Sequence, residues 1–191
     1  MGIKTGRDNF KKFKAIISFL SFFSGFIPSF FHKLIWNFIK PFSSNLVSLI
    51  RYLVLKKLIG DLGDNVNIGA NVTIKNWNGL SFGHNVSIHE NCYLDAFGGI
   101  AIGDNVSIAH NTTLLSSTHT YSDLETPIKY NPIIKCPLEI KDDVWLGCGV
   151  RVLGGLVINR RNIIAAGAVL NISTFEGSIY GGVPAKKIKN I

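Results

Sequence analysis

An apolar residue recurs at six-residue intervals through most of the chain. This period fits neither an amphipathic helix nor an alternating strand, so it predicts a repeat architecture with its own supersecondary unit. The series falls into groups of three, namely Leu62, Ile68, Ile74; Phe82, Ile88, Leu94; Ile102, Ile108, Leu114; Ile140, Leu146, Val152; and Ile158, Ile164, Leu170.

Each six-residue unit pairs its large aliphatic with small, polar or β-branched residues, as in IGANVT (68–73), IGDNVS (102–107) and LGCGVR (146–151). The aliphatic and the small residue can both point inward only if the chain turns a corner every six residues. Asn, Asp and Gly suit such corners because they tolerate turn backbone angles. The sequence therefore predicts an all-β repeat, a parallel β-helix of about five triangular coils over residues 61–180.

The irregular gaps in the series all follow the third member of a group. Two extra residues follow Ile74, two follow Leu94, and twenty follow Leu114. Three consecutive coils therefore bulge at one corner. The largest bulge, the loop at 116–138, is long for a compact domain, and such loops are often functional.

His119 lies five residues after Leu114, at the root of this loop. An imidazole can accept a proton from an alcohol near neutral pH, and its place at the base of a long loop favours a general base over an ordinary surface histidine. Asp95 follows Leu94 at the same corner, one coil earlier, and should lie one strand spacing from Leu115. It could bind sugar hydroxyls or orient the imidazole; the alternative is a solvated corner aspartate.

The repeat resembles that of the hexapeptide-repeat acyltransferases, which implies a left-handed β-helix. The chain is most similar to galactoside and maltose O-acetyltransferases and to membrane-associated acetyltransferases of surface-polysaccharide synthesis. The segments that carry the resemblance are CYLDAFGGIAIGDNVSIAH, STHTYSD, IKDDVWLGCGVRVLGGLVI and YGGVPAKKIK.

The resemblance implies that the site uses acetyl-CoA as acyl donor and needs no metal. It also implies that the site lies in the groove between two prisms of a homotrimer. Transfer in this family is direct, so a nucleophilic role for the Cys148 thiol is not expected. For catalysis, the resemblance implies that His119 is the base and that the backbone amide of Cys148 faces the oxyanion. Asp95 would bind the acceptor, and Trp145 would flank both the acceptor and pantetheine. Ala166 and Gly167 would leave room for pantetheine, and Lys186 and Lys189, on one face of a short C-terminal helix (181–191), would contact the ribose phosphate.

The N-terminal region differs from the rest in charge and composition. Residues 1–60 contain ten Lys or Arg and one acidic residue, whereas the remaining residues carry a net charge of −1. Ten of the thirteen phenylalanines lie at or before Phe42. Basic charge interleaved with apolar surface suits an anionic membrane better than nucleic acid. We therefore expect helices that associate with the inner-membrane surface, on its cytoplasmic face.

The uncharged run at 15–31 is near the lower limit for a spanning helix, and Gly25 and Pro28 interrupt it. A cleavable signal peptide would explain the basic start, but no small-x-small cleavage site follows Phe26. A hydrophobic cap packed on the repeat domain is the other alternative. Three cysteines without a C-x-x-C pair suit a reducing cytoplasm.

Together these features predict an O-acetyltransferase that moves an acetyl group from acetyl-CoA to a sugar hydroxyl, in the synthesis of a cell-surface polysaccharide. The alternatives are an acetyltransferase with a small-molecule or amino-sugar acceptor, a zinc carbonic-anhydrase-like β-helix and a non-catalytic membrane scaffold. A zinc site would have to use His84, His89 and His110, but the register places His84 on a different corner from the other two.

Overall fold

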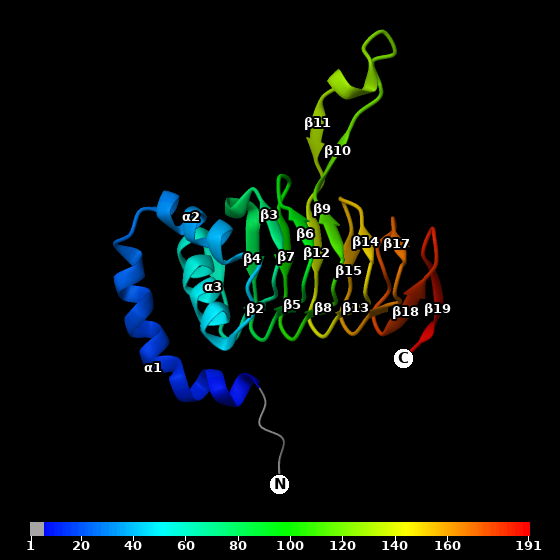
Figure 1. Cartoon of the computed structure of the whole chain (residues 1–191). Helices are drawn as coiled ribbons and strands as arrows, with labels where there is room; N and C mark the ends of the chain where they lie inside the picture. Colours follow the sequence, from blue (N-terminus) through cyan, green and yellow to red (C-terminus); the bar gives the residue numbers. More distant parts are fainter. Residues whose placement is uncertain (1–5) are drawn as a thin grey trace.

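The structure is a computed structural model that describes residues 6–191. Three helices precede the strands, and they cover one end of a prism built from stacked coils (Figure 1). The helices are α1 (Gly6–Gly25), α2 (Ser29–Ile39) and α3 (Asn45–Leu58), and the first strand begins at Asp61. None of the helices among residues 6–191 is long and apolar enough to cross a membrane.

The prism has three faces, each formed by a sheet of parallel strands from successive coils. The first sheet contains β1 (Asp61–Leu62), β4 (Leu80–Phe82), β7 (Ile100–Ile102), β12 (Leu138–Ile140) and β15 (Val157–Ile158). The second contains β2 (Asn67–Ile68), β5 (Ser87–Ile88), β8 (Ser107–Ile108), β13 (Trp145–Leu146), β16 (Ile163–Ile164), β18 (Ser178–Gly181) and β19 (Lys186–Asn190). The third contains β3 (Thr73–Lys75), β6 (Tyr93–Asp95), β9 (Thr113–Leu115), β14 (Arg151–Val152) and β17 (Val169–Leu170).

The strand register confirms the predicted grouping of the apolar series. Leu146, for example, lies between Ile108 and Ile164 in the second sheet, and all three side chains are buried. The first, second and third members of each group fall on the first, second and third sheets respectively. The core is therefore a stack of aliphatic layers inside the prism, each covering the one before it.

The corners are made largely by asparagines with left-handed backbone angles. Seven asparagines have a positive φ, and Asp143 and Arg161 join them at equivalent corner positions. Asparagine adopts this conformation more readily than other non-glycine residues. The seven asparagines are Asn65, Asn71, Asn76, Asn85, Asn91, Asn105 and Asn111.

The C-terminal end differs from the prediction in two respects. β18 stacks on β16, so the solenoid has about six turns rather than five. The predicted C-terminal helix is wrong, because residues Lys186–Asn190 form β19, which pairs antiparallel with β18. This hairpin gives hydrogen-bond partners to backbone groups that would otherwise lie unpaired at the open edge of β18.

Arg51 ties the helices to the first coil. Its guanidinium is buried and donates hydrogen bonds to the carbonyls of Ile68 in β2 (3.0 Å) and of Ile39, Lys40 and Phe42 at the end of α2 (3.0, 3.0 and 2.7 Å). The last three of these carbonyls lie at the C-terminal end of α2, where helix carbonyls lack intrahelical amide donors. One side chain of α3 therefore fixes α2 against the prism.

Candidate active site

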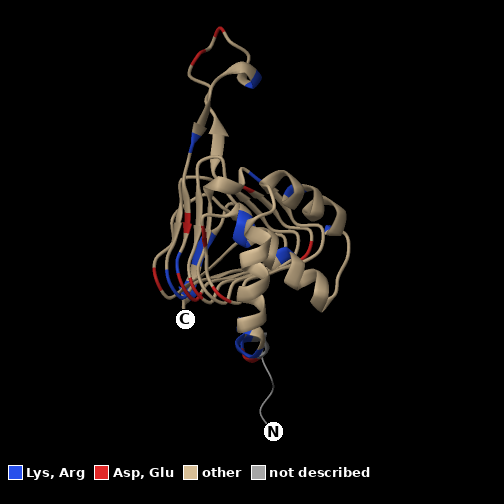
Figure 2. Ribbon diagram, turned by 90° about the vertical axis from the view of Figure 1, so that its left-hand side faces the viewer, with Lys and Arg blue, Asp and Glu red and all other residues tan. Residues whose placement is uncertain are grey.

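The segment after β9 leaves the prism as a β-hairpin. Its strands are β10 (Ser117–His119) and β11 (Ile133–Lys135), which pair antiparallel, and its outer part contains the short 3-10 helix η2 (Ile128–Tyr130). The hairpin starts at the corner between the third and first sheets and projects away from the prism (Figure 1). Figure 2, viewed from the helical end, shows the same projection. The smaller bulge after β3 at this corner holds the 3-10 helix η1 (Trp77–Gly79).

Hydrogen bonds from neighbouring coils hold the root of the hairpin. The Ser116 amide and hydroxyl both donate to the Asp95 carbonyl, at 3.1 and 2.7 Å, and the Cys136 amide donates to the Ser116 carbonyl at 2.8 Å. On the other side, the Gly155 amide donates to the Cys136 carbonyl at 3.0 Å. The hairpin therefore leaves from a hydrogen-bonded layer between two regular coils.

Asp95 lies where the sequence predicts, opposite Leu115 in the neighbouring strand. Its Oδ1 accepts hydrogen bonds from the Asn76 side-chain amide at 2.7 Å and from the Phe97 backbone amide at 3.2 Å. Part of the carboxylate thus stabilises the corner, which is the turn role weighed as the alternative. Its Oδ2 makes no hydrogen bond with the residues that the structure describes.

His119 is the last residue of β10 and pairs with Ile133 across the hairpin. Its side chain is exposed, and it makes no hydrogen bond within residues 6–191. The imidazole is therefore accessible to solvent. It stands on the hairpin, further from the coils than a residue at the root itself.

The tip of the hairpin is also organised by side-chain hydrogen bonds. The buried Asn131 amide donates to the Thr126 carbonyl at 2.8 Å and to the Asp123 carbonyl at 3.2 Å. Hydrogen bonds from Thr126, and from the Glu125 amide, lower the pKa of the Asp123 carboxyl. Apolar side chains such as Leu124 and Tyr121 nevertheless remain exposed. Hydrogen bonds thus order the tip of the hairpin although several of its apolar side chains are exposed.

A second group of predicted site residues gathers at the corner between the second and third sheets. Cys148 follows β13 there, and the Gly167 amide of the next coil donates to its carbonyl at 2.8 Å. Ala166 and Gly167 are exposed beside it. The Cys148 amide has no hydrogen-bond acceptor among the described residues, so it is free to donate to a bound oxygen.

Lys186 and Lys189 lie in β19 on the neighbouring hairpin. A bulge opposite Ile179 and Tyr180 shifts the register, so that Lys186 faces Gly181 and Lys189 faces Ile179. Opposed residues in an antiparallel pair share a face, and Ile179 and Gly181 are two residues apart. The two exposed lysines therefore lie on one face, as predicted, although a bulged strand rather than a helix places them there.

Trp145 begins β13 and is half exposed on the outside of the second sheet. It lines a cavity of about 280 Å³ together with Arg161, Ile163 and the C-terminal Ile191. The second sheet faces away from the corner that carries the hairpin. A single chain therefore does not bring Trp145 or Cys148 together with His119.

The three histidines considered for zinc do not form a metal site. His84 accepts a hydrogen bond at Nδ1 from the Asp64 amide (2.9 Å) at the corner between the first and second sheets, whereas His89 and His110 lie at the next corner. Within residues 6–191 there is no cluster of three or more His, Cys, Asp or Glu side chains that could hold a metal ion.

Sequence reasoning did not identify the residues that position the hairpin. Ser116 and Cys136 fix its two ends, and Gly98 allows their close approach, since a Cβ on Gly98 would lie 2.0 Å from the Ser116 carbonyl oxygen. The position of Ser116 at the start of the long gap in the apolar series is the one sequence feature that could have indicated its role.

The fold is shared with solved acetyltransferase structures. A maltose O-acetyltransferase from Clostridium difficile has a TM-score of 0.74 and 23% identity, with 84% of each chain covered. A galactoside acetyltransferase in complex with coenzyme A has a TM-score of 0.75 and 24% identity, covering 84% of this chain and 78% of the other. A hexapeptide-repeat acetyltransferase from Vibrio cholerae, complexed with acetyl coenzyme A, has a TM-score of 0.74 and 24% identity, covering 83% of this chain and 84% of the other.

Curated proteins match over shorter segments. A probable acetyltransferase from Mycobacterium tuberculosis is 40% identical over 72 residues, which is 38% of this chain and 24% of that protein. A tetrahydropyridine-dicarboxylate N-acetyltransferase from Clostridium perfringens is 37% identical over 60 residues, 31% of this chain and 25% of that protein. The chain thus spans about a quarter of the length of these relatives, and no protein-family profile matches it.

The left-handed β-helix implied by the resemblance is consistent with these neighbours. This chain has the fold of the hexapeptide-repeat acetyltransferases, and the predicted resemblance to them is confirmed at that level.

Proposed function

We propose that the protein is an acetyl-CoA-dependent O-acetyltransferase that acts on a sugar hydroxyl in the synthesis of a cell-surface polysaccharide. The observation that carries the proposal is the hairpin, which holds an accessible histidine beside the corner that presents Asp95. Solved neighbours of the same fold bind coenzyme A or acetyl coenzyme A, which supports the choice of acyl donor.

The residues of the corner between the second and third sheets fit this donor. Ala166 and Gly167 leave the corner open for a narrow pantetheine chain, and the Cys148 amide is available to an oxyanion. Lys186 and Lys189 supply cations for phosphate on one face of the adjacent hairpin.

In the proposed reaction, His119 takes the proton from the acceptor hydroxyl as that oxygen attacks the thioester carbonyl. The Cys148 amide stabilises the negative charge that develops on the carbonyl oxygen. When the carbon–sulfur bond breaks, the protonated imidazole returns the proton to the leaving thiolate, so that His119 is regenerated. Asp95 contributes hydrogen bonds to the other hydroxyls of the sugar.

The separation of His119 from Cys148 in one chain supports a site formed between two chains. The hairpin projects from one corner, and the residues proposed to bind the donor lie at another, so we infer that a second copy supplies the other half of the site. The homotrimer implied by the resemblance meets this need, because each prism would receive the hairpin of its neighbour.

N-acetyl transfer to an amino sugar or another amine is the second candidate. It is favoured by the N-acetyltransferase among the matching relatives and by a solved N-acyltransferase of Bacillus cereus with a TM-score of 0.58 and 22% identity. A His119 base serves either acceptor, so the acceptor must be identified by assay.

The test is the release of free CoA from acetyl-CoA by the full chain, with panels of sugars, nucleotide sugars, lipid-linked oligosaccharides and amines. His119→Ala should lower turnover about 100- to 10,000-fold. His84→Ala is the matched control, because His84 is an exposed histidine on a different corner. Equal turnover by wild type and His119→Ala would overturn the assignment, and activity with amines alone would select the second candidate.

A further inference from the structure

The outward sides of α1 and α2 each expose a series of large apolar side chains, and we call the two series together the aromatic face. Each of its side chains is exposed, up to 73% for Phe26 and 76% for Phe38. Monomeric soluble proteins seldom expose a large contiguous apolar patch without using it. The aromatic face comprises Ile16, Phe19, Phe22, Phe23 and Phe26 in α1 and the turn after it, and Phe30, Phe31, Leu34 and Phe38 in α2.

The aromatic face is not an extension of the core. The opposite sides of the same helices already pack inward, through Ile17 of α1 and through Trp36 and Ile39 of α2, all of which are buried. Trp36 meets Trp77 of the prism edge to face, with ring centroids 4.9 Å apart. The inward sides of both helices therefore already have packing partners, and the outward phenylalanines are not part of that packing.

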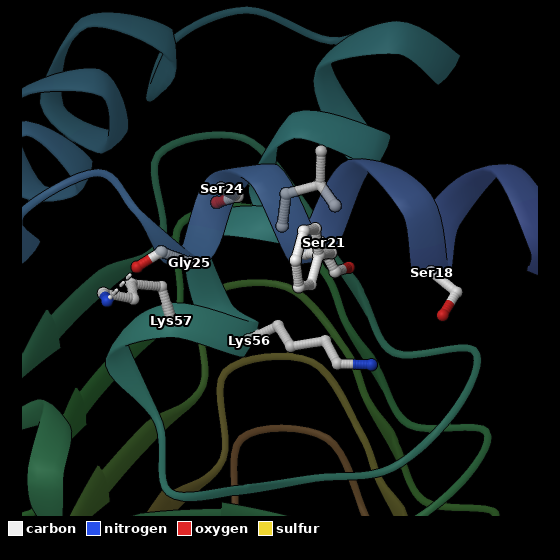
Figure 3. Close-up of a pocket in the computed structure, with 8 residues that line it drawn as sticks. Ser18, Ser21, Ser24, Gly25, Lys56 and Lys57 are labelled. Carbon is white, nitrogen blue, oxygen red and sulfur yellow. Dashed lines mark hydrogen bonds between the residues drawn. The ribbon is translucent and has the colours of Figure 1, made fainter.

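A cavity of about 350 Å³ lies beside the aromatic face, between α1 and α3 (Figure 3). Phe22 belongs both to its wall and to the aromatic face, so the two surfaces are continuous. The polar side chains of the wall come from both helices. They are the hydroxyls of Ser18, Ser21 and Ser24 and the ammonium groups of Lys56 and Lys57.

The two lysines of this cavity are in different states. The Lys57 ammonium donates to the Gly25 carbonyl at the end of α1, at 2.7 Å (Figure 3). The Lys56 ammonium makes no hydrogen bond or ion pair with the residues that the structure describes. The Ser21 hydroxyl donates to the Ile17 carbonyl at 2.7 Å and the Ser24 hydroxyl is hydrogen-bonded to His32 Nε2 at 2.8 Å, so Ser18 offers the available hydroxyl of the wall. An unpaired ammonium and a serine hydroxyl match the chemistry of a phosphate group.

We propose that the aromatic face and this lysine cavity together bind an anionic phospholipid bilayer, with the cavity receiving a headgroup phosphate. The strong positive charge of residues 1–60 gives the electrostatic complement to such a surface. Because no described helix could span a bilayer, α1 and α2 lie in its interface with their phenylalanines among the acyl chains. The proposal does not depend on acetyl transfer.

The experiment is co-sedimentation of the full chain with vesicles of phosphatidylglycerol and phosphatidylcholine, compared with phosphatidylcholine alone, at about 0.1 M salt. We expect binding to the anionic vesicles and little to the neutral ones. Lys56→Gln should weaken binding several-fold, and Lys56→Gln with Lys57→Gln about tenfold or more. Phe19→Ser with Phe23→Ser should also weaken binding, since each substitution removes apolar area that the bilayer would bury.

The matched control is Lys75→Gln with Lys129→Gln, which removes the same charge from exposed lysines outside α1, α2 and α3. It should bind as the wild type does, and circular dichroism should show that all variants are folded. Equal binding to neutral vesicles, or equal loss in the control, would overturn the proposal. The proposal would also be overturned if the wild type does not bind vesicles and the Phe19→Ser, Phe23→Ser variant forms a smaller assembly than the wild type. A second copy of the chain would then cover the aromatic face.

Discussion

The Cys136 amide donates a 2.8 Å hydrogen bond to the Ser116 carbonyl, and this contact closes the base of the hairpin that carries His119. Gly98 lies against it, with its amide 2.9 Å from the Ser116 hydroxyl oxygen to which it donates. The position of His119 therefore depends on the close packing of the backbone at Gly98 against the backbone at Ser116 and Cys136.

Gly98→Ala should disturb this approach. The new Cβ would lie 2.0 Å from the Ser116 carbonyl oxygen and 2.7 Å from the Cys136 nitrogen, so the hairpin root must shift. We expect a loss of CoA-releasing activity of about tenfold or more, since small displacements of a catalytic group are costly. Gly60→Ala is the control, because a Cβ there meets no atom within 4 Å. Full activity of Gly98→Ala would show that the root does not position the site.

Cys148→Ala should retain turnover within about twofold, because the proposed mechanism uses the backbone amide alone. Steady-state rates of CoA release measure this directly. A loss comparable to that of His119→Ala would instead indicate that the thiol takes part in the reaction.

Cys92 should resist thiol reagents in the folded protein. Burial raises the pKa of its thiol to about 11, and the side chain is 1% exposed. The thiolate is the reactive form, so Cys136 and Cys148, which are partly exposed, should be labelled first at neutral pH. Mass spectrometry with and without denaturant can count the labelled sites, and rapid labelling of Cys92 in the native protein would contradict its burial.

The same thiol should make stability fall at alkaline pH. The folded-state pKa of Cys92 lies above its ordinary value of 9.0, so folding favours the protonated form. Its contribution is complete below about pH 9 and is lost as the pH rises towards about 11. Urea unfolding of wild type and Cys92→Ala across this range should show a smaller fall in the variant. Parallel curves would show that Cys92 does not contribute to it.

Arg51→Met should strongly destabilise the helices on the prism. Four carbonyl oxygens would lose the Arg51 guanidinium, although those of Ile39 and Lys40 keep a backbone amide donor. Each charge-assisted bond contributes about 1.5–3 kcal/mol, so we expect a loss of at least about 3 kcal/mol. Arg160→Met, at an exposed arginine, is the control. Both are compared by urea unfolding at one protein concentration. Equal unfolding midpoints would show that Arg51 is not needed to hold the helices.

The repeat could be predicted from the sequence in detail because a period of six permits one geometry. Once the apolar series was grouped in threes, Asp95 had to lie beside Leu115, and the structure places it there. Corner residues follow equally well, because their left-handed backbone favours asparagine and glycine.

The features that could not be predicted from the sequence depend on contacts between segments that are distant along the chain. The spacing of Lys186 and Lys189 predicted a helical face, but a β-bulge produces the same spacing, and only the open edge of β18 decides between them. Arg51 was one of the ten basic residues counted in residues 1–60, and its buried role was not predicted, because the sequence does not show that the end of α2 lies beside α3. The paired strands of the loop likewise depend on its root, which two other coils hold in place.

The stacked coils also set a length scale along the prism. Each coil advances the chain by about 4.8 Å, so the span from the hairpin after the third coil to the lysines of β19 is a whole number of such steps. Gaining or losing a coil would change that span by one full step and leave the corners aligned. The number of coils therefore sets how far apart the hairpin and the β19 lysines lie along the prism, and this distance can change only in steps of one coil.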